Sequence, residues 1–478
     1  MVAADQAADP DGAAGLDPTG ELRELASDCV HCGFCLPACP TYQLWGEEMD
    51  SPRGRIHLIT QILDGAQAQD AAAVHFDRCL GCMACVTACP SGVRYDRLIE
   101  AARSWSQEPP AGTRPLPARS LRDRAIRAAI FATFPYPRRL RLLTAPLRAA
   151  QRGGLDRLLA GRPAPGGGQA RPGIAERLSP ELAAALRVAP RPRGQVTRGQ
   201  VTRREVSRGE VSRRAALPER VPARGQRRAV VGMLTGCVQQ VFFPEVNAAT
   251  ARVLAAEGCD VVIPRGQGCC GALSLHAGRR TEAAGFARRC IAEFERAGVD
   301  AVVVNAAGCG SAMKEYAEAL AGDALWAGRA AAFSGKVRDL TEFLAELGPV
   351  AQRHPLPVTV AYHDACHLAH AQRITRQPRD LLAAIPDLRL AEIADAGTCC
   401  GSAGIYNLVQ PEAAGELGER KARAVRETGA SLLVSANPGC ALQISSALAA
   451  QGTVLPMAHV AQVLDASIRG VEVSALLA

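Results

Sequence analysis

The chain has 478 residues, 18 cysteines and a formal net charge of +8. Its length predicts two or three domains, and a hydrophobic content of 48% is enough to build their cores. It lacks a run of about eighteen apolar residues and the basic-then-apolar pattern of a signal peptide, so we expect a cytoplasmic protein without a membrane-spanning helix. In that reducing compartment, cysteines are more often metal ligands than disulfides.

Cysteine placement and composition divide the chain into segments. The cysteines fall into a first group of eight and a last group of ten, separated by a stretch that contains none. We expect a disordered tail at 1–20, an α-helical ferredoxin-like domain at 21–108, amphipathic Arg-rich helices at 109–160, a disordered Arg/Pro/Gly linker at 161–228, and two duplicated α/β cysteine-rich domains with parallel sheets at 229–350 and 351–478.

Two cysteine runs share the spacing C-x2-C-x2-C-x3-C-P. The runs are Cys29, Cys32, Cys35 and Cys39 before Pro40, and Cys79, Cys82, Cys85 and Cys89 before Pro90. In this spacing three thiolates bind one cubane and the fourth reaches a different cluster. We therefore predict one [4Fe–4S] cluster at Cys29, Cys32, Cys35 and Cys89, and a second at Cys39, Cys79, Cys82 and Cys85. Structural zinc is the alternative, but four-cysteine zinc sites usually consist of two separated pairs.

The middle of the chain is strongly basic. Residues 101–228 carry 28 arginines, no lysine and 8 acidic residues, while the rest of the chain carries 27 basic and 39 acidic residues. Apolar residues at helical spacing between 117 and 159 predict amphipathic helices, which suit either a membrane surface or a partner subunit. A five-residue tandem repeat at 193–214 (RGQVT, RGQVT, RREVS, RGEVS) fits neither helix nor strand. Because no aromatic residue interleaves its arginines, we expect a linker and no nucleic-acid binding.

The last group of cysteines is an internal duplication. Cys237, Cys269 and Cys309 correspond to Cys366, Cys399 and Cys440 at offsets of 129, 130 and 131 residues, and each copy contains Cys-Cys-Gly, with Cys270 and Cys400 as the second cysteine. Short apolar runs precede these cysteines, and helical stretches separate the runs. This alternation predicts parallel sheets with crossover helices. The cysteines then follow the carboxyl ends of strands, where open α/β sheets bind ligands.

Two histidines flank a cysteine of the second copy. His363 and His367 lie on either side of Cys366, where an imidazole can bind a metal or donate a hydrogen bond to a thiolate. Because four cysteines already complete a tetrahedral site, we interpret both histidines as structural or hydrogen-bonding. Cys259 and Cys290 lie outside every motif and are expected to be buried thiols.

The two halves resemble known families. The first resembles the α-helical ferredoxin domain of succinate dehydrogenase-type iron–sulfur subunits, and the second resembles the CCG cysteine-rich domain of heterodisulfide reductases. Each copy keeps four of the five family cysteines, since Ala306 and Asn437 replace the fifth. The resemblance implies a further iron–sulfur or zinc centre in each copy, at Cys237, Cys269, Cys270 and Cys309, and at Cys366, Cys399, Cys400 and Cys440.

Two ferredoxin runs followed by two CCG domains resemble the iron–sulfur subunit of bacterial glycolate oxidase (glycolate dehydrogenase). Matching stretches are CVHCGFCLPACPTY from Cys29 to Tyr42, SPRGRI from Ser51 to Ile56, CPSGVRY from Cys89 to Tyr95, and CCGSAG from Cys399 to Gly404. The resemblance implies an FAD-binding partner subunit that oxidises glycolate to glyoxylate, and a quinone-type acceptor reached at the inner face of the cell membrane.

The chain itself shows no motif for substrate chemistry. It contains no G-x-G-x-x-G, P-loop or Ser/His/Asp pattern, and oxidation of a 2-hydroxy acid needs a hydride acceptor such as flavin or nicotinamide. We therefore expect no catalytic residues here, only electron transfer. The alternative in the same class is the iron–sulfur subunit of an anaerobic glycerol-3-phosphate dehydrogenase or of a heterodisulfide reductase-like complex.

Overall fold

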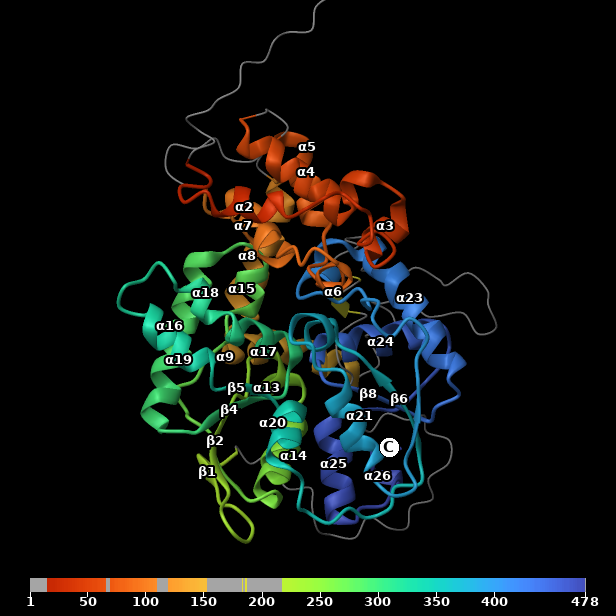
Figure 1. Ribbon diagram of the computed structural model, residues 1–478. Helices are drawn as coiled ribbons and strands as arrows, with labels where there is room; N and C mark the ends of the chain where they lie inside the picture. Colours follow the sequence, from red (N-terminus) through yellow and green to blue (C-terminus); the bar gives the residue numbers. More distant parts are fainter. Residues whose placement is uncertain are drawn as a thin grey trace, which may run out of the picture.

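The computed structural model describes residues 15–65, 69–109, 119–152, 183, 185–186 and 217–477. A helical N-terminal part lies across the top of two α/β units that stand side by side (Figure 1). Most of the expected tail at 1–20 and linker at 161–228 lies outside the described residues. The expected tail is wrong near its C-terminal end, because Leu16 is buried in the helical core. The expected linker is wrong near its C-terminal end, because the strand β1 (Arg220–Val221) joins the first sheet.

The N-terminal part is helical, as the sequence predicted. Its helices are α2 (Glu21–Ser27), α3 (Pro40–Trp45), the 3₁₀ turn η1 (Glu48–Asp50), α4 (Pro52–Leu63), α5 (Gln69–Arg78), α6 (Ala84–Ala88) and α7 (Tyr95–Gln107). Helix α4 begins where the Ser51 hydroxyl accepts from the Gly54 N–H at 3.0 Å, with Pro52 at the first helical position. Its Ile59 and Ile62 pack against Leu98 of α7 in one core, each side chain contributing about 1.5–3 kcal/mol.

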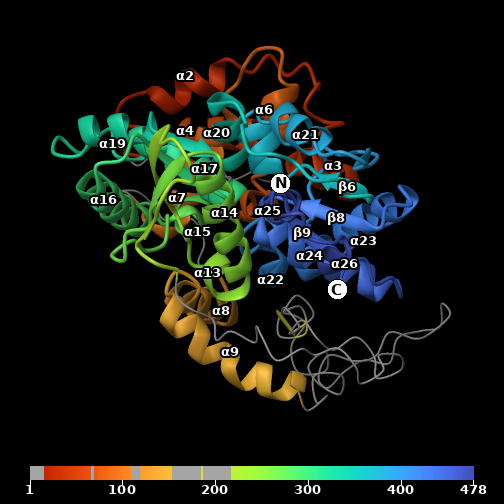
Figure 2. The ribbon, with the colours of Figure 1, turned by 90° about the horizontal axis from the view of Figure 1, so that it is seen from below.

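Two basic helices connect the parts. They are α8 (Leu121–Thr133) and α9 (Pro137–Arg152), and both lie outside the two α/β units (Figure 2). Ile130 and Phe131 of α8 are buried against Ile405 and Leu408 of the second α/β unit. On α9, Leu142 remains exposed to solvent.

Each α/β unit is built on its own sheet. The first sheet has the order β1-β3-β2-β4-β5 and the second the order β7-β6-β8-β9, and every neighbouring pair is parallel except β1 with β3. The strands are β2 (Ala229–Met233), β3 (Cys259–Val262), β4 (Ala301–Val304), β5 (Val337–Asp339), β6 (Thr359–His363), β7 (Arg389–Ala391), β8 (Leu432–Ser435) and β9 (Met457–His459). This confirms the expected duplicated α/β architecture, although β5 and β9 were not foreseen.

Helices cover both sheets and join the two units. In the first unit they are α13 (Val238–Phe242), α14 (Pro244–Ala256), α15 (Ala272–His276), α16 (Arg280–Ala297), α17 (Ala307–Lys314), α18 (Tyr316–Ala319), α19 (Ala327–Ser334) and α20 (Leu340–Leu347). In the second they are the π-turn η2 (His367–Ala371), α21 (Arg376–Ala383), α22 (Tyr406–Val409), α23 (Pro411–Glu427), α24 (Pro438–Ala450), α25 (Val460–Arg469) and α26 (Ser474–Leu477). Helices α14 and α25 pack together and share one apolar core with both sheets, and Arg252 donates to both oxygens of Asp465 at 2.9 and 2.7 Å.

Candidate metal centres

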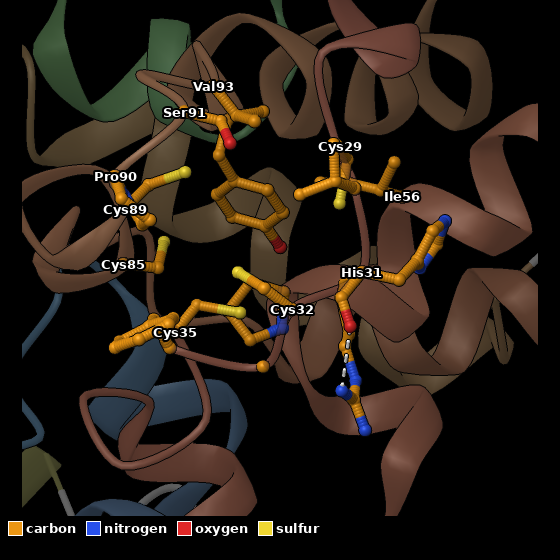
Figure 3. A pocket seen from close by; sticks show the side chains of 16 residues that line it. Cys29, His31, Cys32, Cys35, Ile56, Cys85, Cys89, Pro90, Ser91 and Val93 are labelled. Carbon is orange, nitrogen blue, oxygen red and sulfur yellow. Dashed lines mark hydrogen bonds between the residues drawn. The ribbon is translucent and has the colours of Figure 1, made fainter.

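A pocket near the surface of the helical part gathers the first predicted ligand set. Cys29, Cys32 and Cys35 lie on the loop between α2 and α3, Cys89 ends α6, and all four line this pocket (Figure 3). The loop turns tightly because Gly33 has a φ of 86°, a conformation that favours glycine. Cys32 is exposed, so this pocket opens toward solvent.

A second, more buried pocket gathers the other set. It is lined by Cys39 at the start of α3 and by Cys79, Cys82 and Cys85 around α6. The two pockets adjoin, since Cys85, Pro52 and Tyr95 border both. The fold therefore brings the eight cysteines to two adjoining pockets, with Cys85 at the border of both.

The thiols that line the second pocket differ in how readily they ionise. Burial raises the pKa of Cys82 and of Cys85 well above the usual range. Burial also opposes ionisation of Cys79, but the charges of Arg55 and Arg103 outweigh it and lower its pKa. The Gly81 N–H donates to the Cys79 sulfur at 3.3 Å and the Tyr95 hydroxyl at 3.6 Å. Such convergent buried thiols, next to positive charge and N–H donors, suit a metal cluster that binds thiolates.

A buried arginine, Arg55, lines this pocket. Arg55 is 0% exposed and donates to the Thr41 hydroxyl at 3.2 Å, to the His75 carbonyl at 2.7 Å and to Asp50 at 3.3 Å. Arg55 was not among the residues predicted from the sequence. A signal was available, because an arginine stands on the apolar side of a predicted helix, beside Ile59 and Ile62 one and two turns along.

The first α/β unit gathers Cys237, Cys269, Cys270 and Cys309. Cys237 follows β2, the Cys-Cys pair follows β3, and Cys309 lies in the first turn of α17 after β4. The Cys237 and Cys269 sulfurs are 3.6 Å apart. Contacts with Cys237 and Cys270 raise the pKa of Cys269, whereas contacts with Cys269 and Cys309 lower that of Cys270, so the four sulfurs form one connected group.

The second α/β unit gathers Cys366, Cys399, Cys400 and Cys440 in the same way. Cys366 follows β6, the Cys-Cys pair follows β7, and Cys440 lies in the first turn of α24 after β8. Contacts with Cys399 and Cys440 lower the pKa of Cys400, and the contact with Cys399 lowers that of Cys366. Both α/β units thus present four converging sulfurs beyond the carboxyl ends of parallel strands, a donor set that fits zinc or an iron–sulfur cluster.

The positions that lack the fifth family cysteine face each other across the two units. Asn437 donates through its Nδ2 atom to the Cys440 sulfur at 3.4 Å and accepts through Oδ1 from the Gly308 N–H, also at 3.4 Å. The Ala307 N–H donates to the Ala436 carbonyl at 3.1 Å. The first turns of α17 and α24, which carry Cys309 and Cys440, therefore adjoin.

The second unit also adjoins the more buried pocket of the helical part. Cys82 belongs to the same buried cluster as Cys366 and Cys399, and negative charge on Cys366 contributes to the raised pKa of Cys82. Helix α6 contacts η2, where the Thr87 hydroxyl and His370 Nδ1 are 3.0 Å apart. Three groups of cysteine sulfurs thus adjoin in space. The group in the exposed pocket borders the group in the buried pocket, which in turn borders the group in the second α/β unit.

The fold and these sites define a class: an iron–sulfur protein with a helical cysteine-rich domain followed by a duplicated α/β cysteine-rich domain. A family model for the 4Fe-4S dicluster domain matches residues 25–93, and one for the CCG cysteine-rich domain matches 231–314 and 360–445. A third, described as the linker region of the glycolate oxidase iron–sulfur subunit, matches 122–163.

Curated relatives identify the particular family. The chain is 36% identical to the "Probable glycolate oxidase iron-sulfur subunit" of Bacillus subtilis and 35% identical to the "Glycolate oxidase iron-sulfur subunit" of Escherichia coli, in each case over 89% of this chain and 89% and 91% of the relative. It is 31% identical to "Lactate utilization protein A" of Shouchella clausii, over 49% of this chain and 98% of that protein. The chain belongs to the family of glycolate oxidase iron–sulfur subunits.

Among residues covered by the structure, no helix combines the length and apolar character needed to cross a bilayer.

Proposed function

We propose that this chain is the electron-transfer subunit of a flavin-dependent glycolate dehydrogenase. The observation that carries the proposal is the succession of adjoining sulfur groups from the exposed pocket through the buried pocket to the second α/β unit. Iron–sulfur clusters in such sites supply one-electron transfer, at potentials set by charge, hydrogen bonds to sulfur and solvent exposure. A chain that only carries electrons needs a separate subunit to take hydride from the substrate.

The eight cysteines of the helical part are the proposed cluster ligands. Cys29, Cys32, Cys35 and Cys89 hold one [4Fe–4S] cluster, and Cys39, Cys79, Cys82 and Cys85 hold the other. Cys85 borders both pockets, so its assignment rests on the spacing of the second run as well as on position. The four sulfurs of each α/β unit hold a further iron–sulfur or zinc centre.

The exposed pocket is the proposed docking site of the FAD-binding subunit. Val30 and Phe34 stand beside Cys29, Cys32 and Cys35 and are 70% and 66% exposed. Large apolar side chains on a loop that also carries an exposed ligand cysteine suit a protein partner that delivers electrons at that point.

Helix α9 is the proposed contact with the membrane that holds a quinone-type acceptor. Its exposed face carries Leu142 and Leu143 together with Arg138, Arg139 and Arg141, a combination that binds anionic lipid surfaces. Replacing both leucines with aspartate is expected to abolish cosedimentation of the complex with vesicles of anionic lipid. The matched change Leu121→Asp, at an exposed position of α8, should leave it intact.

The central experiment is glycolate-driven reduction of the intact complex, purified without oxygen. Cys32→Ser should remove about four irons per chain and abolish reduction of the remaining centres by glycolate, because the docking-site cluster is lost. Cys259→Ala, at a buried thiol outside every sulfur group, should change neither quantity. Reduction by glycerol 3-phosphate but not glycolate, or unimpaired reduction in Cys32→Ser, would contradict the proposal.

A further inference from the structure

A histidine of the second α/β unit is buried without a hydrogen-bond partner. His363 ends β6, its side chain is 1% exposed, and neither ring nitrogen has a partner among the described residues. Leaving a buried polar group unpaired destabilises the folded state. The group beside this ring is the Cys400 thiol, so the imidazole faces the sulfurs of the second unit.

The His363 ring lies against two of the cysteine sulfurs. A ring nitrogen, the Cys400 sulfur and the Cys440 sulfur all lie within 4.8 Å of one another. Ligands of one tetrahedral metal, bound at 2.0–2.3 Å, are about 3.5 Å apart. Only small side-chain rotations are therefore needed for these three atoms to bind the same metal atom.

The duplication shows that the fold does not require this histidine. Cys366 corresponds to Cys237, and the residue three positions earlier is His363 in one copy and Leu234 in the other. Leu234 is also 1% exposed, and it packs in a cluster that contains Cys270. The first unit thus has an apolar side chain at this position. The second unit has an imidazole there, next to the sulfurs of Cys400 and Cys440.

The neighbouring histidine does not share this geometry. The Nδ1 atom of His367 lies 3.6 Å from the Cys366 sulfur, and its ring packs on that of His276 with a centroid distance of 4.8 Å. Among the described residues, His367 does not belong to the group that His363 forms with Cys400 and Cys440. His367 is therefore the natural control for any effect of His363.

We propose that His363 is a metal ligand in the second α/β unit, beside Cys400 and Cys440, so that the two duplicated centres differ in their ligands. This inference rests on the proposed function only in assuming that the cysteine-rich units hold metal. Because a tetrahedral metal atom takes four ligands, the imidazole takes the place of one of the four cysteine thiolates at that atom. This exchange removes negative charge, and in iron–sulfur centres histidine in place of cysteine raises the reduction potential. The second centre, which adjoins the buried pocket, would accept an electron more readily than the first.

The test is spectroscopic and uses the complete complex labelled with ¹⁵N-histidine and purified without oxygen. If the second centre contains iron, pulsed EPR of the reduced protein should show one directly bound histidine nitrogen. If it contains zinc, X-ray absorption should show one nitrogen among the sulfur ligands. His363→Leu, which places the leucine of the first unit at this position, should eliminate the nitrogen signal. If the centre contains iron, the same variant should also lower its reduction potential. His367→Leu should retain the nitrogen signal.

A further variant separates ligand loss from unfolding. His363→Cys should keep the metal content of the wild type while converting the nitrogen signal to sulfur. Persistence of the nitrogen in His363→Leu, or only the weak coupling of a hydrogen-bonded nitrogen in the wild type, would overturn the assignment. Metal-free cysteine-rich units would overturn it too, while glycolate-driven reduction of the clusters in the helical part would still support the proposed function.

Discussion

The two cysteine-rich units place four sulfurs at the same ends of matching strands, yet their surroundings differ. Around the first group, Cys237 and Cys269 pack with Phe286. Helix α13, which begins directly after Cys237, contacts α9. Around the second, Cys366 and Cys399 pack with Cys82 of the helical part. Duplication has therefore preserved the donor set, while the residues packed beside each group of sulfurs differ.

The largest effect should come from removing one sulfur in each unit. Cys400→Ser and Cys270→Ser are each expected to empty their own centre and lower quinone reduction by more than about 100-fold, beyond the loss typical of outer-shell changes. Only Cys270→Ser should leave the second centre reducible by glycolate, because that centre adjoins the buried pocket. The reducible centres of both variants are counted by redox titration. An equal loss in the two would show that electrons do not reach the second centre before the first.

The next effect concerns how the first unit is attached to the helical part. Arg103 is buried and donates to the carbonyls of His276 at 2.8 Å, of Phe76 at 3.4 Å and of Cys79. Arg103→Ala leaves these acceptors unpaired and should lower the free energy of unfolding by about 2–4 kcal/mol in denaturant titrations.

Arg97 is the control for this attachment. It pairs with Glu21 at 2.7 Å and with Glu318 of the first unit at 3.7 Å. Because all three side chains are partly exposed, Arg97→Ala should cost below about 1 kcal/mol. A similar loss of stability in both variants would mean that the buried contacts of Arg103 do not hold the units together.

A smaller difference is expected at the glycine after each Cys-Cys pair. Gly271 and Gly401 have φ angles of 83° and 86°, so alanine at either position costs about 1–2 kcal/mol in the left-handed region. A Cβ on Gly401 would lie 2.6 Å from the Ala414 carbonyl oxygen, whereas one on Gly271 would lie 3.2 Å from that of Ala283. Gly401→Ala should therefore lower the melting temperature more than Gly271→Ala, and the reverse order would contradict this packing.

The last expected effect is a pH dependence confined to the first unit. Burial and the nearby charge of Glu100 raise the pKa of Glu315 to about 8, while the second unit has Ser446 at the equivalent position. The folded protein keeps this proton where the unfolded chain releases it, so stability is lost as pH rises from the ordinary carboxyl pKa toward 8.

Glu315→Gln tests this directly. The substitution should flatten the decline by at most about 1.4 kcal/mol per pH unit, measured as the free energy of unfolding between pH 6 and pH 8. An unchanged slope in the variant would show that Glu315 is already ionised in the folded state. Ser446→Ala, the matched change in the second unit, should leave the slope as it is.

The sequence by itself determined the sulfur groups and the architecture that carries them. Spacing grouped the eight cysteines of the helical part, since a cubane constrains ligands that are close in the chain. Apolar runs alternating with amphipathic stretches predicted the parallel sheets, and constant offsets between cysteines revealed the duplication. Short edge strands such as β9, and the pairing of β1, were missed because so few residues carry no clear periodicity.

Only the tertiary structure decided which groups are neighbours. Nothing in the sequence near His363 distinguishes it from His367, since the difference is the direction of each side chain toward sulfurs that are distant along the chain. The approach of Cys82 to Cys366, and the buried contacts of Arg55 and Arg103, likewise depend on how separate elements pack. Ligand spacing is a local property of the chain, whereas the order of the centres and the charge around them arise from long-range packing.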